Sequence, residues 1–108
     1  MEIFDLKDAE DRVVAFEVYS FSRRAARRLV RATPGATLLA FHGLREIFCE
    51  FEVDGVQFEM REPYNDNSRY WIGPSAPGRF SQIEAVRKTF ARARDFWLFV
   101  WIPGRDQR

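Results

Sequence analysis

Residues 46–62, EIFCEFEVDGVQFEMRE, decide the fold. Two runs of alternating apolar and polar residues flank Asp54-Gly55, a pair typical of two-residue hairpin turns in which both residues take positive φ. Closing the hairpin at this pair predicts five cross-strand pairs, which are Val53–Val56, Glu52–Gln57, Phe51–Phe58, Glu50–Glu59 and Cys49–Met60. The apolar pairs lie on one face and the acidic residues on the other. The stretch therefore predicts an antiparallel sheet with a core face and an acidic face.

Outward from the hairpin, the sequence predicts further strands and two helices. The other predicted strands cover residues 2–6, 12–19, 36–41, 69–72 and 96–102. One helix is expected from an N-cap at Ser22 to the stop signal at residues 33–35, and a second from Ser81 to Asp95. A helix is the alternative for 12–19 and for 96–102, because apolar residues in both segments also recur at helical spacing. This order predicts an α+β fold, a two-layer sandwich of a mainly antiparallel sheet with both helices on one face.

Length and composition limit the classes of protein that fit. The 108 residues suit a single domain, residues 1–108, and 46% apolar content is normal for a folded chain. One cysteine and one histidine exclude an internal disulfide and a metal site with several histidines, and no cofactor is expected. The longest apolar run, residues 96–102, is far shorter than the ~20 residues that cross a bilayer. No targeting segment is visible, so we expect a cytoplasmic protein that does not bind membranes.

The net charge of +1 hides a strong segregation of charge along the chain. Residues 1–20 carry a net charge of −4 and residues 46–62 a net charge of −5. Residues 21–33 contain five arginines and no acidic residue, and residues 79–94 carry a net charge of +4. In the predicted sandwich the helices are therefore basic and the open sheet face is acidic.

The first predicted helix carries a basic ridge. Its members follow i, i+3, i+4, i+7 spacing and are Arg24, Arg27, Arg28 and Arg31. The simpler interpretation is that these arginines form a solvated helix face in an arginine-rich sequence. The functional interpretation is that they form a surface that binds an acidic partner protein, an anion or nucleic acid. The acidic sheet face and the lack of a known nucleic-acid motif disfavour nucleic acid.

Two further segments are candidate binding sites. If 96–102 is a strand, Trp97, Phe99 and Trp101 share its outward face and form an apolar patch suited to a partner or to a homodimer. Cover by a loop or by the N-terminal strand, or a helical conformation of the segment, would remove that argument. A possible ligand-binding group is Asp66, Asn67, Arg69, Tyr70 and Trp71, which combines turn formers, a cation and aromatic rings. The alternative there is a plain turn with an aromatic residue in the core.

Two stretches resemble known sequences. FCEFEVDGV at 48–56 and DNSRYWIGP at 66–74 are similar to segments of small uncharacterised bacterial proteins. The resemblance implies a bacterial, cytoplasmic protein and brings no activity, cofactor or site residues with it.

No catalytic constellation stands out. Cys49 falls on the core face of the hairpin, and His42 is placed at a strand end, so a Cys-His pair is not expected. Glu50 and Glu59 face each other across the hairpin, yet they do so on an open sheet face where Arg61 or Arg69 can neutralise them. We therefore expect a non-enzymatic protein-interaction module that binds a protein partner or itself. The alternative is a domain that binds a small ligand or anion.

Overall fold

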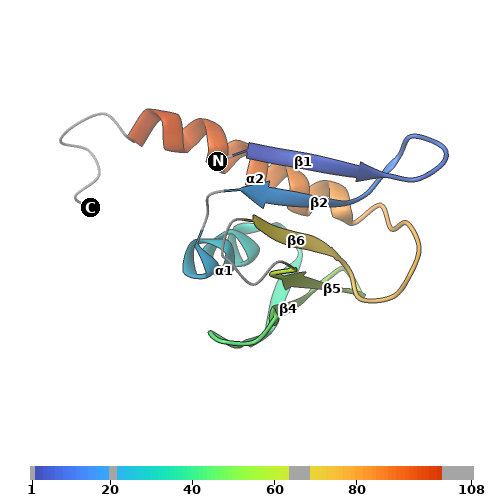
Figure 1. Cartoon of the computed structure of the whole chain (residues 1–108), viewed down its shortest axis with the longest axis horizontal. Coiled ribbons are helices and arrows are strands. Elements are labelled where there is room, and N and C mark those ends of the chain that lie inside the picture. Colours follow the sequence, from blue (N-terminus) through green and yellow to red (C-terminus); the bar gives the residue numbers. More distant parts are fainter. Residues whose placement is uncertain (1, 20–21, 64–68, 101–108) are drawn as a thin grey trace.

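The structure, a computed structural model, describes the backbone of residues 2–19, 22–63 and 69–100 and the side chains of these residues up to 93. Figure 1 shows the chain order of the elements. The strands are β1 (Glu2–Lys7), β2 (Val13–Tyr19), β3 (Ala36–Phe41), β4 (Ile47–Val53), β5 (Val56–Arg61) and β6 (Arg69–Pro74). The helices are α1 (Arg23–Ala32) and α2 (Ile83–Val100).

All six strands form one antiparallel sheet in the order β1-β2-β6-β5-β4-β3. The hairpin of β4 and β5 has the expected register at all five pairs, and Asp54 and Gly55 take φ values of 47° and 86°. Both turn residues are thus left-handed, as a two-residue hairpin requires. The sheet and its two helices confirm the predicted α+β class.

Besides a register shift between Leu6 and Lys7 in the β1–β2 pair, two bulges interrupt β3 and β4, and neither was expected from the sequence. One falls between Leu38 and Ala40 in β3, and the other between Ile47 and Cys49 in β4. An extra residue breaks the alternation of faces, so that Phe48 and Cys49 are both fully buried although they are neighbours in a strand. The second bulge therefore adds the ring of Phe48 to the core at the start of β4.

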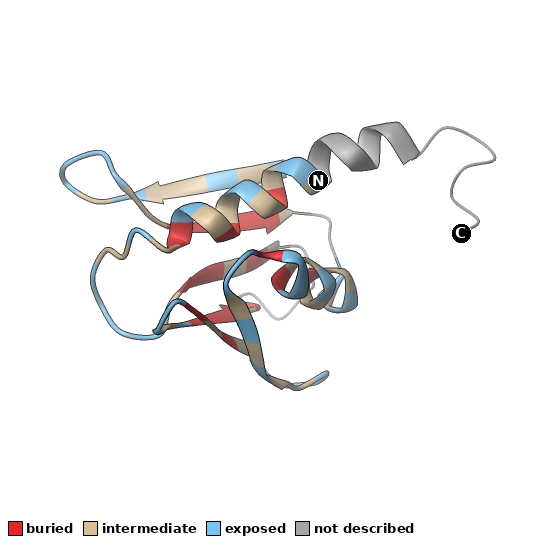
Figure 2. Cartoon of the chain, turned by 180° about the vertical axis from the view of Figure 1, so that it is seen from behind, coloured by how far each residue is buried: buried red, intermediate tan, exposed pale blue. Residues whose placement is uncertain are grey.

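The core lies between the sheet and the helices. Both helices and one face of the sheet contribute to a single apolar cluster, which contains Ala26 and Val30 from α1 and Ile83, Val86 and Phe90 from α2. Phe16 of β2 meets Phe90 edge to face, with ring centroids 5.4 Å apart. Figure 2 shows buried positions along the inner sides of both helices and on the strands behind them.

The strand expected at 96–102 is wrong, because α2 continues to Val100. The helix neither ends at Asp95 nor meets a glycine or proline before residue 103. The stripe of Ile83, Val86 and Phe90 reaches Trp97 at the same helical spacing, so the apolar run extends a helix already in progress. Neither this helix nor α1 is both long and apolar enough to cross a membrane, as far as the described residues go.

Candidate functional site

The position of the arginine-rich helix α1 is fixed by its N-cap and by two buried apolar residues. The Oγ of Ser22 accepts a hydrogen bond from the N–H of Ala25 at 3.0 Å, which caps the first turn as expected. Ala26 and Val30 are fully buried against the sheet. Every arginine of the helix is therefore turned to its flanks and its outer side.

Arg23 fastens α1 to the loop between β3 and β4. Its guanidinium donates to the carbonyl oxygens of Gly43 and Arg45 at 2.9 and 2.7 Å and forms an ion pair with the buried Glu62. The same group lies over the ring of Phe48, 4.6 Å from its centre. Arg23 is thus a structural residue and not a part of the surface that α1 presents to solvent.

The predicted ridge divides into one packed arginine and three exposed ones. Arg27 lies over the Phe41 ring of β3, with its Cζ 4.5 Å from the ring centre. Arg24, Arg28 and Arg31 are exposed and form no ion pair in the described part of the chain. The structure therefore brings three of the four predicted residues into solvent on one short helix.

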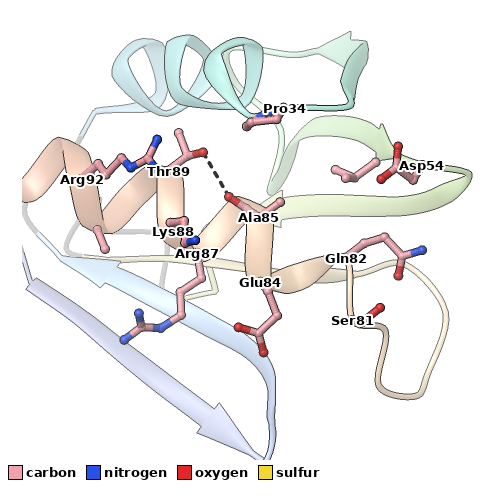
Figure 3. A pocket seen from close by; sticks show the side chains of 12 residues that line it. Pro34, Asp54, Ser81, Gln82, Glu84, Ala85, Arg87, Lys88, Thr89 and Arg92 are labelled. Atoms are coloured by element: carbon pink, nitrogen blue, oxygen red, sulfur yellow. Dashed lines mark hydrogen bonds between the residues drawn. The ribbon is translucent and has the colours of Figure 1, made fainter.

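The second helix adds two more cations beside a groove. Arg87 is held by Asp5 of β1 in a two-pronged ion pair, with N–O distances of 2.7 and 2.9 Å. Lys88 and Arg92 are exposed and line a groove of about 730 Å³ between α2, the end of α1 and the hairpin turn. Figure 3 shows Pro34 and Asp54 on its far side and Ser81 and Gln82 at one end. The groove is a second candidate site, which the sequence alone did not indicate.

The basic side chains described on the sheet are ion-paired, whereas most of those described on the helices are not. Arg61 pairs with Glu59 at 2.8 Å and Arg69 with Glu17 at 3.0 Å, both on the sheet face away from the core. Among the described side chains, the cations without a carboxylate within ion-pair distance are Arg24, Arg27, Arg28, Arg31, Arg45, Lys88 and Arg92. All of them lie on the helices or on the adjoining loop at 42–46. We call the exposed helical members the basic surface, which comprises Arg24, Arg28, Arg31, Lys88 and Arg92.

The described members of the predicted ligand group, Arg69, Tyr70 and Trp71, do not share one face of β6. Tyr70 is buried and meets the Phe48 ring edge to face, with centroids 5.0 Å apart. Trp71, the next residue in the strand, points to the opposite face. Arg69 is occupied by Glu17 and by the hydroxyl of Tyr19. Asp66 and Asn67 lie outside the described residues.

Trp71 instead belongs to a stack on the open sheet face. The guanidinium of Arg61 lies 4.6 Å from the centre of the indole, and Gly73 lies beneath the benzo edge of the ring. A Cβ at Gly73 would stand 2.5 Å from the Cη2 of Trp71. The spacing of Trp71 and Gly73, two apart in a strand, was the sequence signal that could have revealed this contact.

The predicted aromatic patch loses its geometric basis, since 96–100 is helical. Trp97 and Phe99 do not alternate across a strand, and their side chains lie outside the described ones. Trp101 lies outside the described residues altogether. Their role in binding stays a prediction.

Groups with catalytic potential are constrained. Glu50 and Glu59 are opposite each other as expected, and Glu59 is the one that Arg61 neutralises. Burial raises the pKa of Cys49 to about 12, which makes its thiol unreactive at neutral pH. Within the described ranges, His, Cys, Asp and Glu form no group of three that could hold a metal ion.

Comparison with known proteins brings no relative to this arrangement: neither a protein-family model, nor a characterised protein, nor a solved structure matches the chain.

Proposed function

We propose that the chain is a non-catalytic interaction module whose basic surface binds an acidic surface of a partner protein. The observation that carries the proposal is the unequal pairing of cations. Every basic side chain described on the sheet and its β1–β2 loop has a carboxylate partner, whereas the five members of the basic surface have none. Unneutralised cations gathered on one layer are suited to an anionic partner.

A protein partner fits this surface better than nucleic acid. Single-stranded nucleic acids use aromatic rings next to cations as stacking platforms. Here two rings beside α1 are already covered by arginines, Phe41 by Arg27 and Phe48 by Arg23. Glu50 and Glu52 on the open sheet face add repulsion toward a polyanion that wraps the domain.

Self-association of basic surface to acidic sheet face is the weaker version of the proposal. Glu59 and Glu17 of that face are already paired with arginines of the same chain. The carboxylates left for a second copy on β4 are Glu50 and Glu52. A separate acidic partner therefore offers more complementary charge than a second copy of this chain.

The test is binding of a fluorescent oligoglutamate peptide, followed by anisotropy at low and high salt. We expect binding that weakens between roughly 50 and 500 mM salt and is also weakened in Arg24→Gln/Arg28→Gln. The matched control is Lys7→Gln/Arg12→Gln, which removes the same charge from residues that are ion-paired at the β1–β2 turn. Equal loss in both variants, or tighter binding of a single-stranded oligonucleotide than of the peptide, would contradict the proposal.

The groove supports a second candidate, the binding of a small anion. Its volume of about 730 Å³ lies in the usual range for ligand sites, and its walls carry the cations Lys88 and Arg92 as well as the carboxylates of Asp54 and Glu84. Thermal melts with inorganic phosphate, citrate and adenosine monophosphate test it, because a ligand that binds the folded state raises the Tm. We expect Lys88→Gln/Arg92→Gln to abolish any such shift and Arg24→Gln/Arg28→Gln to preserve it. Unchanged Tm with all three probes would exclude these anions.

A further inference from the structure

β3 is an edge strand that lacks protective charges, although a bulge interrupts it. It closes one end of the sheet, and its six residues, ATLLAF, include neither a charged residue nor a proline. β1, at the other end, carries Glu2, Asp5 and Lys7, and Asp5 is tied to α2. Edge strands commonly carry charge because their unpaired backbone groups can otherwise pair with another chain. The two ends of this sheet therefore differ in how open they are to an added strand.

Apolar side chains are exposed around β3, next to the polar Thr37 and the charged Arg45 and Glu46. Leu39 is 48% exposed at the bulge, and Leu44 and Ile47 of the next loop and strand are exposed as well. The bulge shortens the regular part of the edge, so that a short segment fits it better than a long strand. This end of the sheet offers a backbone edge and a small apolar contact.

One flank of α1 lies above the same edge. Arg27 rests on Phe41 of β3, which fixes the flank of the helix that faces this strand. Arg31 follows one turn later on that flank, and α1 runs back along β3 because residues 33–35 connect the two directly. A strand added beside β3 would have every second side chain on the helix side, within reach of these arginines.

A second copy of the chain is a poor occupant. Pairing β3 with the β3 of another copy around a two-fold axis would bring two α1 flanks together. Arg27 and Arg31 of each copy would then face the same residues of the other, and like charges in contact oppose association. The positive charge of this flank therefore favours an acidic segment over a second copy of the chain.

We propose that the β3 edge and the Arg27–Arg31 flank form one docking site for a short extended segment with acidic residues at every second position. The segment joins the sheet as a seventh strand next to β3 and directs its carboxylates toward α1. Strand addition supplies backbone hydrogen bonds, and the alternating carboxylates supply the specificity. This inference rests on the proposed function, since it names the segment of the acidic partner and its mode of binding.

Two peptides of equal composition separate the mode from the charge. One alternates glutamate and threonine, and the other holds the glutamates in one block followed by the threonines. We expect the alternating peptide to bind roughly tenfold more tightly, and N-methylation of alternate backbone nitrogens to remove that advantage. Equal affinity of the two peptides would contradict strand addition but would remain consistent with binding of an acidic partner. Binding of neither would overturn the proposed function as well.

A protein variant and an exchange measurement complete the test. Leu39→Asp places a negative charge on the edge and should lower the affinity for the alternating peptide roughly tenfold. Its control, Phe4→Asp, makes the same change at a 57% exposed residue on the opposite edge strand and should leave binding unchanged. Amide hydrogen exchange across residues 36–41 should slow when the alternating peptide binds. Unchanged exchange in bound protein would show that the peptide sits elsewhere.

Discussion

The indole of Trp71 lies so close over Gly73 that a methyl group at Gly73 would stand 2.5 Å from Cη2 and 2.8 Å from the Cβ of Ala15. The guanidinium of Arg61 also lies over the indole, 4.6 Å from its centre. An open sheet face thus acquires a packed layer of its own, in which a glycine provides the space for a large ring.

Gly73→Ala should destabilise the domain. The added methyl must displace the indole and loosen its contact with Arg61, a cost of about 1–3 kcal/mol in the free energy of unfolding. Urea denaturation followed by circular dichroism measures it. Gly43→Ala is the control, because nothing lies within 4 Å of a Cβ there, and its effect should stay within about 1 kcal/mol. Equal effects of the two substitutions would contradict the packed position of Trp71.

Neighbouring arginines at the start of α1 should have opposite effects on stability. Arg23→Gln removes the ion pair with buried Glu62 and two hydrogen bonds to loop carbonyls, and should cost about 2–4 kcal/mol. Arg24→Gln removes an exposed cation from the first turn, where it opposes the helix dipole, and should stabilise by about 0.3–1 kcal/mol. Thermal denaturation at low salt compares the two. A loss of stability in Arg24→Gln would indicate a structural partner for this residue.

Together with the binding test, Arg24 provides a sharper expectation. A substitution that stabilises the fold but weakens binding of the acidic peptide identifies a residue that serves binding at the expense of stability. Measuring affinity and Tm on the same Arg24→Gln protein checks this. Parallel loss of both would place Arg24 in the fold and not in the binding surface.

The aromatic contact between Arg27 and Phe41 should contribute a measurable part of the stability near the β3 edge. Phe41→Leu keeps an apolar side chain but removes the ring that Arg27 covers and the edge contact with Phe48, whose centroid lies 6.3 Å away. The expected loss is about 1–2 kcal/mol. In the double variant with Arg27→Gln the losses should be less than additive, as a double-mutant cycle would show. Full additivity would mean that the two residues do not interact.

Stability should fall in alkaline solution. Burial raises the pKa of Cys49 from 9.0 to about 12, and burial together with the nearby Glu62 carboxylate raises the pKa of Tyr70 above its ordinary value of 10.0. The unfolded chain therefore releases these protons at lower pH than the folded one, so the free energy of unfolding decreases as pH rises above about 9. Denaturant titrations from neutral pH upward measure the slope. Cys49→Ala should flatten it near pH 9 to 10, and an unchanged slope would assign the effect to other groups.

Local signals explain which parts of the fold were predictable. Asp54-Gly55 fixed the hairpin register because both turn residues and every alternating pair agreed, and Ser22 capped α1 as its chemistry indicates. Residues 96–100 were assigned to a strand because a run of large apolar residues fits both periodicities. The continuing helix decided between them. The bulges at Leu39 and Phe48 left no signal in the sequence, since a bulge depends on the partner strand.

The sequence showed which basic residues the candidate site contains, but not which of them form ion pairs or pack against rings. The five arginines of α1 were visible, but Arg23 and Arg27 are held by loop carbonyls and rings that lie at least fourteen residues away in the chain. Likewise Arg69 meets Glu17 from a distant strand. Tyr70 and Trp71 were grouped as one ligand site, although the alternation of a strand already places neighbouring residues on opposite faces.

The cations described on the sheet are ion-paired, whereas the five members of the basic surface are not, and this difference governs how the molecule meets a partner. Ion pairs at contact distance cancel most of their field a few ångströms away, whereas the unpaired helical charges project into solvent. An approaching anion therefore experiences attraction mainly from one side and turns the domain toward itself before any contact forms. Salt should then slow association much more than it speeds dissociation, which makes encounter, and not residence time, the step that ionic strength controls.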